Sequence, residues 1–240
     1  MITIRHNKLI FPIFLKGLLF LPFNIRRPFL KRLFPNPYKK VNDDHKIIFI
    51  HIPKCGGISI ENAIFREKIG HSKIWLYKAF DKTRFNQYYK FTFVRNPWDR
   101  LVSAFFFLRA GGRNPKDKQW AEENLSKYEG FEDFVLSLQK NRIRRTILRH
   151  QHFRPQYHYL LDEKGNMPFD FVGKIEQFRE DFETVKNHLG LSGELEHTNK
   201  SSHKPYQYYY NERTQKIVAH FYQKDIKLLN YSFEKKGFNL

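Results

Sequence analysis

The segment between residues 53 and 59 places a lysine, two glycines and a serine in an order that suits an anion. Its residues are, in order, Pro53, Lys54, Cys55, Gly56, Gly57, Ile58 and Ser59. Glycines let backbone N–H groups turn inward and surround oxygen atoms, because they adopt positive φ without steric cost. Lys54 adds a full positive charge and Ser59 a hydroxyl donor. The segment therefore predicts a phosphate-binding loop.

The order of these residues argues against a nucleoside triphosphatase. The loop of those enzymes follows the pattern Gly-x-x-x-x-Gly-Lys-Ser/Thr, in which lysine stands after the glycines. Here Lys54 precedes Gly56 and Gly57. We also find no acidic residue at a strand end that would hold magnesium. The pattern favours transfer from a nucleotide without a metal ion, and we expect no metal site.

A second basic motif begins at Arg95, directly after an apolar run. A guanidinium group can hold a phosphate through two parallel hydrogen bonds, so Arg95 is a candidate for a second phosphate site. The structural alternative is an ion pair between Arg95 and Asp99, which stands four residues later. Asn96 and Pro97 suit the cap and the first turn of a helix, so we expect Arg95 at a junction between strand and helix.

Three short apolar runs, residues 47–52, 88–94 and 169–174, predict the strands that position these motifs. Each is rich in β-branched or aromatic residues, which is typical of strands buried on both faces of a parallel sheet. Strands that alternate with helices indicate an α/β fold. We therefore predict a P-loop-like central parallel sheet flanked by helices, with ligands bound beyond the carboxyl ends of the strands.

Helical patterns fill most of the chain between and after these strands. We expect a polar loop over residues 111–118. The predicted helices cover residues 58–65, 97–108, 119–127, 131–140, 177–189 and 211–229.

Composition limits the class of ligand. The 240 residues include 43 basic and 24 acidic side chains, a formal net charge of +19. Such an excess attracts polyanions, which include nucleic acid, anionic lipid, acidic polysaccharide and nucleotides. Cys55 is the single cysteine, so the chain can form neither an intrachain disulfide nor a cysteine-based metal site.

The two basic motifs together resemble those of the carbohydrate sulfotransferases. His51 to Ser59 resembles their 5′-phosphosulfate loop, and Phe91 to Ser103 is similar to their 3′-phosphate motif. More narrowly, the match is to sulfotransferase family 2, which includes heparan 2-O-, chondroitin and HNK-1 type enzymes. The resemblance covers about residues 46–235. Two residues depart from it: Cys55 stands where the family usually has threonine, and Ile58 stands where the family often has threonine.

The resemblance implies a donor, a reaction and roles for single residues. The donor is 3′-phosphoadenosine 5′-phosphosulfate (PAPS), and the acceptor is a hydroxyl of a poly- or oligosaccharide. Residues 53–59 would bind the 5′-phosphosulfate, with Lys54 catalytic, and Arg95 and Ser103 would hold the 3′-phosphate. His71, in a Gly-His-Ser segment similar to one of the family, is our candidate general base. Its rivals are Glu61, His150 and His152.

A strongly basic tract at residues 142–154 is a candidate surface for the acceptor. We single out Arg145, Arg149 and His152, because an acidic polysaccharide or a glycolipid-linked precursor would need cationic side chains. Solvated surface charge is the plainer interpretation. A different class of function is a non-catalytic polyanion- or nucleic-acid-binding protein, but basic residues at both phosphate motifs argue against it, and we expect no specific nucleic acid partner.

Residues 1–45 form a hydrophobic and basic leader, and we predict a sulfotransferase domain over residues 46–240. The apolar run at residues 9–23 is interrupted by Pro12, Lys16 and Pro22 and is shorter than the ~20 residues of a spanning helix. Two interpretations stay open: an arm packed on the domain, or peripheral contact of residues 9–40 with an anionic membrane. We expect a cytoplasmic protein, peripheral at the inner membrane face; the alternative is a membrane-anchored protein of Golgi type.

Overall fold

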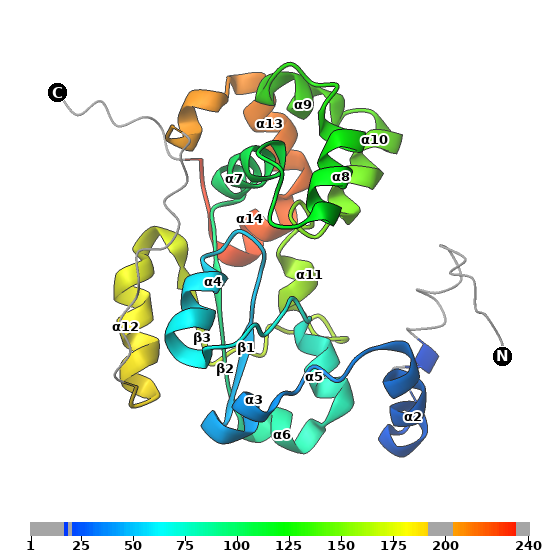
Figure 1. Cartoon of the computed structure of the whole chain (residues 1–240), viewed down its shortest axis with the longest axis vertical. Coiled ribbons are helices and arrows are strands. Elements are labelled where there is room, and N and C mark those ends of the chain that lie inside the picture. Colours follow the sequence, from blue (N-terminus) through cyan, green and yellow to red (C-terminus); the bar gives the residue numbers. More distant parts are fainter. Residues whose placement is uncertain (1–16, 19–20, 192–203, 234–240) are drawn as a thin grey trace.

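The computed structural model describes residues 17–18, 21–191 and 204–233 (Figure 1). Its sheet has three parallel strands in the order β1-β2-β3. They are β1 (Ile47–Ile50), β2 (Tyr89–Val94) and β3 (Phe171–Lys174). Ile50 pairs with Thr92, and Thr92 pairs with Val172, so the carboxyl ends of the strands meet at one edge. The three predicted strands and the α/β class are confirmed.

Side chains alternate between the two faces of the sheet and form separate cores. Ile48 and Ile50 pack with α5 (Ile74–Phe80) and α6 (Lys82–Gln87). Phe49 and Phe91 pack on the opposite face with α12 (Phe178–His188). Figure 1 shows α12 on one side of the sheet and α5 and α6 on the other. Both faces are therefore covered by helices, as the continuous apolar strands require.

A third core is helical and lies beyond the carboxyl ends of the strands (Figure 1). Its helices are α7 (Pro97–Arg109), α8 (Pro115–Leu125), α9 (Phe131–Ser137), α10 (Asn141–Arg149), α13 (Glu212–Phe221) and α14 (Gln223–Leu229). Short elements complete the fold: α4 (Gly57–Ile60), the π-helix η1 (Glu61–Phe65), α11 (Tyr157–Leu160), and the 3₁₀ turns η2 (Ile175–Gln177) and η3 (Tyr206–Tyr209).

Several predicted helix boundaries differ from the structure, and two of the differences have a clear physical reason. The helix predicted from residue 119 begins at Pro115, because the side chain of Asn114 caps it and proline suits its first position. The single helix predicted over residues 211–229 divides at Tyr222, whose φ of −107° and ψ of 17° interrupt the helical geometry. The Tyr222 hydroxyl donates to the Phe153 carbonyl over 2.6 Å, which fixes the position of this break.

Part of the predicted leader is folded onto the domain. It contains α2 (Phe23–Leu33) and α3 (Lys40–His45). Leu18 and Leu30 are buried in the same core as α5. Most of the apolar run at residues 9–23 lies outside the described residues. No helix in the described ranges is long and apolar enough to cross a bilayer.

Candidate active site

Lys54 lies in the turn between β1 and α4, at the carboxyl edge of the sheet. Its φ of 70° and the φ of 71° at Gly56 are both left-handed, which is uncommon for a lysine. The Lys54 ammonium lies 4.0 Å from the centre of the Phe107 ring, on α7. Burial, followed by the charge of Arg95, lowers the pKa of Lys54 to about 8. The loop therefore holds a partly desolvated cation whose charge an anion would stabilise.

The glycine pair of this loop is required by close packing on both sides. A Cβ atom at Gly57 would lie 2.1 Å from Cδ2 of His51, and one at Gly56 would lie 2.6 Å from Cδ1 of Ile175. Gly57 therefore lets the chain pass directly over the His51 ring, at the start of α4. Ile58, one of the departures from the family pattern, is half-buried beside it.

Arg95 stands at the carboxyl end of β2 and reaches toward this loop. Its Nε donates to Asp99 over 2.7 Å, and its Nη1 donates to the Lys54 carbonyl over 3.3 Å. The ion pair with Asp99 that the sequence left open is present. Arg95 therefore connects the two basic motifs in space, with one edge of its guanidinium held by α7. Ser103 lies further along α7 and is 3% exposed.

Gln156 fixes the turn that follows β2. Its Oε1 accepts from the Arg95 N–H over 3.0 Å, and its Nε2 donates to the Arg95 carbonyl over 2.8 Å. The Cys55 thiol also donates to Oε1, over 3.3 Å. Asp225 accepts from the backbone N–H groups of Gln156 and Tyr157 and is fully buried. This amide therefore ties both phosphate motifs together, and nothing in the local sequence around it indicated that role.

Two residues from the C-terminal part of the chain, Glu176 after β3 and Tyr231, support the same junction. Glu176 accepts from the Asn96 N–H over 2.7 Å and from the Tyr231 hydroxyl over 2.9 Å. Burial is the main reason that the pKa of Tyr231 lies far above its ordinary value, and the neighbouring Glu176 carboxylate raises it further. The start of α7, which carries Asp99 and Ser103, is therefore held by the segment after β3 and by the C-terminal end.

Arg100 is 2% exposed and lies beneath the first loop. Its Nε donates to the Pro53 carbonyl and its Nη1 to the Arg154 carbonyl, each over 2.9 Å. Its Nη2 is buried and has no hydrogen-bond partner among the described residues. The hydrogen-bond partners of Arg100 among the described residues are therefore backbone carbonyls, which leaves its full positive charge close to the loop.

His71 lies on the loop before α5 and approaches the end of β1. Its Nδ1 donates to the His51 carbonyl over 2.9 Å, since a carbonyl oxygen can only accept. In the neutral ring this bond leaves Nε2 unprotonated. Burial lowers the pKa of His71 to about 4, and the nearby His51 acts in the same direction. His71 is therefore neutral near pH 7, with one nitrogen able to accept a proton.

Glu61, a rival for the role of base, holds the loop that carries His71. Its Oε1 accepts from Nδ1 of His51 over 2.8 Å and from the N–H groups of Ile69 and Gly70 over 2.8 and 3.3 Å. Burial alone would raise the pKa of Glu61, but the hydrogen bond and charge of His51 lower it overall. Glu61 opens the π-helix η1, and its carboxylate is 4% exposed. This geometry suits an ionised positioning group.

The other two rivals, His150 and His152, lie in the loop after α10. Burial, followed by the charge of His150, lowers the pKa of His152 to about 2, and Lys54, His71 and Arg100 contribute in the same direction. All four of these side chains affect the pKa of His152, which places them near its ring. The centre of the His152 ring lies 5.1 Å from that of the Phe107 ring, which also lies under the Lys54 ammonium.

The candidates for acceptor binding thus divide into two groups. His152 lies close to Lys54 and His71, whereas Arg145 and Arg149 are exposed on α10. Across the described ranges, no group of three or more histidine, cysteine, aspartate or glutamate side chains is arranged to hold a metal ion.

Comparison with known proteins places this site in a family. The chain is 27% identical over 226 residues to carbohydrate sulfotransferase 9 of Homo sapiens, which covers 78% of this chain and 47% of the human protein. It is 33% identical over 127 residues to carbohydrate sulfotransferase 11 of Rattus norvegicus and, equally, of Mus musculus, covering 47% of this chain and 36% of each relative. The chain thus spans less than half the length of these relatives. No solved structure matches it.

A sequence profile described as the sulfotransferase family matches residues 38–232. The match begins inside the predicted leader and includes Lys54, His71, Arg95 and Ser103. It spans both basic motifs, the complete sheet and the helices beyond it. The family expected from two short motifs is therefore confirmed over most of the chain: this protein belongs to the sulfotransferase family.

Proposed function

We propose that this protein transfers the sulfuryl group of PAPS to a hydroxyl of a carbohydrate. The observation that carries the proposal is the convergence of Lys54, Arg95 and His71 at the carboxyl edge of β1 and β2, through contacts with the Lys54 and His51 carbonyls. Ligands in open α/β sheets bind at this edge. The family match and the similarity to carbohydrate sulfotransferases support the same reaction.

The loop and its surroundings fit a nucleotide with phosphates at both ends. Residues 53–59 would hold the 5′-phosphosulfate. Lys54 and Nη2 of Arg100, which has no hydrogen-bond partner among the described residues, would place positive charge beside it. Arg95 and Ser103 would hold the 3′-phosphate. Because Nε of Arg95 donates to Asp99 and Nη1 donates to the Lys54 carbonyl, Nη2 is the atom that would bind the phosphate. PAPS would supply the sulfuryl group and leave as 3′-phosphoadenosine 5′-phosphate (PAP).

The roles of the side chains follow from charge. As the bond from sulfur to the bridging oxygen breaks, negative charge grows on the 5′-phosphate, and Lys54 would stabilise it. His71 Nε2 would take the proton of the attacking hydroxyl while Nδ1 stays bound to the His51 carbonyl. Glu61 would keep this loop in place. His152 would contact the acceptor near these groups, and Arg145 and Arg149 would extend the cationic surface for a longer polymer.

The test of the proposed function is a transfer assay with radiolabelled PAPS and a panel of acidic and neutral oligosaccharides. We expect label to move to at least one saccharide without added metal. We also expect PAP to bind the free protein with a similar Kd in the presence and in the absence of sequence-random DNA. Tight, salt-dependent DNA binding together with no PAP binding would instead support the polyanion-binding alternative.

We further propose that α2 contacts an anionic membrane surface, as one interpretation of residues 9–40 suggested. Ile25 and Phe29 are 48% and 50% exposed, and they lie four residues apart on one face of the helix. Leu21, 41% exposed, continues the stripe, and Lys31 and Arg32 stand in the last turn. An apolar stripe beside cations fits the boundary between lipid headgroups and acyl chains.

We expect the double variant Ile25→Ser/Phe29→Ser to bind vesicles that contain phosphatidylglycerol about tenfold more weakly than wild type, because the inserted apolar area is lost. Co-sedimentation measures this, with pure phosphatidylcholine vesicles as reference. The matched control is Tyr208→Ser, which replaces a 60% exposed aromatic residue in η3, outside α2. Equal sedimentation of the wild type and the double variant would rule out α2 as the contact.

A further inference from the structure

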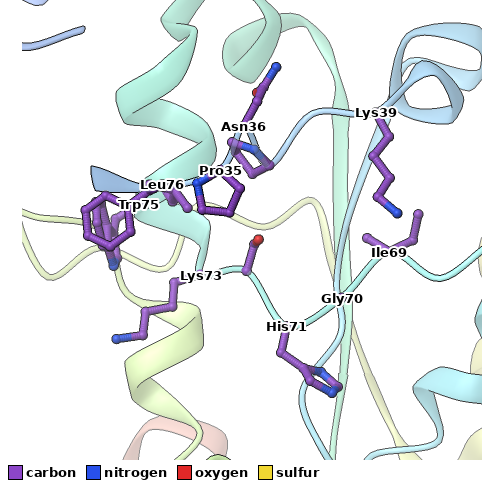
Figure 2. A pocket seen from close by; sticks show the side chains of 12 residues that line it. Pro35, Asn36, Lys39, Ile69, Gly70, His71, Lys73, Trp75 and Leu76 are labelled. Atoms are coloured by element: carbon purple, nitrogen blue, oxygen red, sulfur yellow. The ribbon is translucent and has the colours of Figure 1, made fainter. Parts of the chain in front are cut away.

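A pocket of about 480 Å³ opens beside His71 (Figure 2). One wall is the loop that carries His71 and continues through Lys73 to Trp75 at the start of α5. The other wall is the segment from Phe34 to Lys39, which joins α2 to α3 and lies largely before the region that matches the family. The proposed base is therefore one side of a cavity whose other side comes from the leader.

Lys73 and Lys39 both line this pocket but differ in their partners. Lys39 forms an ion pair with Glu67 and donates to the Lys68 carbonyl. Lys73 is half-buried, and its ammonium forms no hydrogen bond or ion pair within the described residues. Figure 2 shows Lys73 on the side of Trp75, apart from Lys39. Of the two lysines, Lys73 is the one whose charge the protein itself leaves unpaired.

The surroundings of Lys73 add positive charge. Burial and then the charge of Arg154 lower the pKa of Lys73 to about 8. Burial also lowers the pKa of His158 to about 4, with contributions from Lys73, Arg154 and Lys224. No carboxylate contributes to either shift. Lys73 and Arg154 are half-buried, whereas His158 and Lys224 are exposed. A bound anion would stabilise the like charges of Lys73 and Arg154.

The remaining lining suits a sugar ring. Trp75 contributes an indole held edge-to-face against Phe34, with ring centres 5.6 Å apart. Asn36 and Ser72 contribute polar side chains, and Figure 2 shows Asn36 beside Pro35 on the leader wall. An aromatic surface with a few polar groups and one unpaired charge is the pattern of a site for a polar ligand that carries a single anionic group.

We propose that this pocket is the acceptor subsite, and that Lys73 recognises an anionic substituent, a carboxylate or a phosphate, on a sugar adjacent to the reacting hydroxyl. The inference rests on the proposed function, because it takes His71 as the point where the hydroxyl reacts. It adds that the segment Phe34–Lys39, outside most of the family region, helps to select the acceptor. Acceptors without a negative charge at this position would bind more weakly.

The test compares binding rather than turnover, using the full chain saturated with PAP. Calorimetry would measure three probes: an oligosaccharide of alternating hexuronic acid and N-acetylhexosamine, its carboxyl-reduced form, and a phosphodiester-linked oligosaccharide. We expect at least one anionic probe to bind wild type about tenfold more tightly than the neutral form. Lys73→Met should remove that difference and leave PAP binding unchanged. Which anionic probe loses affinity identifies the carboxylate or the phosphate as the ligand.

Lys68→Met is the matched control, because Lys68 is an exposed lysine near the same loop that does not line the pocket. Equal binding of anionic and neutral probes to wild type would overturn the inference, as would an unchanged preference in Lys73→Met. Failure of the proposed function gives a different result: no label transferred from PAPS, whatever the binding preference. Retained PAP binding in Lys73→Met shows that the variant is folded.

Discussion

Replacing Lys54 with methionine is expected to lower kcat for sulfate transfer about 100-fold or more while the protein stays folded. Methionine keeps the apolar contact with the Phe107 ring but removes the charge that would stabilise the leaving 5′-phosphate. Loss of one preorganised group that stabilises developing charge costs about 10²–10³ in kcat. Initial rates with saturating PAPS, together with thermal unfolding of both proteins, measure the effect.

The same substitution should change how PAP binding depends on pH. The pKa of Lys54 is lowered to about 8 in the free protein, so its ammonium is charged below pH 8 and loses its proton above it. Wild-type affinity for PAP should therefore fall as the pH rises from 7 to 9, a range in which Lys54→Met should be flat. Lys116→Met, at an exposed lysine on α8, is the control and should behave as wild type. A wild-type rate for Lys54→Met would remove Lys54 from the mechanism.

Replacing His71 with asparagine is expected to lower kcat about 10²–10⁴-fold, the usual contribution of a general base. The asparagine amide can still donate a hydrogen bond toward the His51 carbonyl, so the loop between Glu61 and α5 should keep its position. PAP binding should be unchanged, because no proposed nucleotide contact is lost. Single-turnover rates and PAP titrations separate the two effects.

The pH profile provides a second readout for His71. Because burial lowers its pKa to about 4, the imidazole is neutral above that value, and protonation should reduce the wild-type rate only as the pH falls toward 4. His71→Asn should lack this acidic limb. His188→Asn, at an exposed histidine on α12, should retain both the limb and the rate. A His71→Asn protein with normal turnover would shift the role of base to His152, the rival whose pKa the charge of Lys54 lowers.

The strands β1 and β2 could be predicted because they are buried on both faces, whereas the residues of β3 are mostly half-buried. Residues 47–50 are all buried, so the apolar run is continuous and cannot be mistaken for a half-exposed strand. The capping residues Asn96 and Pro97 likewise marked the start of α7. The break at Tyr222 could not be predicted, because it depends on a hydroxyl contact with Phe153, which lies 69 residues earlier in the chain.

The phosphate motifs could be located by residue type, but not the groups that position them. Gln156 lies 61 residues from Arg95, and Asp225 lies another 69 residues beyond it, so no local spacing relates them. Glu61 is a comparable case. It appeared in the sequence as a rival base, whereas its three hydrogen bonds in the structure suit a support for the loop that carries His71.

The sequence by itself determined the α/β class, the two basic motifs and the family, because each depends on residues close together in the chain. Tertiary structure decided that Lys54 lies over Phe107, that the His51 carbonyl orients His71, and that a leader segment closes a pocket beside this histidine. These arrangements depend on contacts between distant segments, and burial at those contacts sets the charge state of each group. The amino-acid order specifies such contacts only through the completed fold.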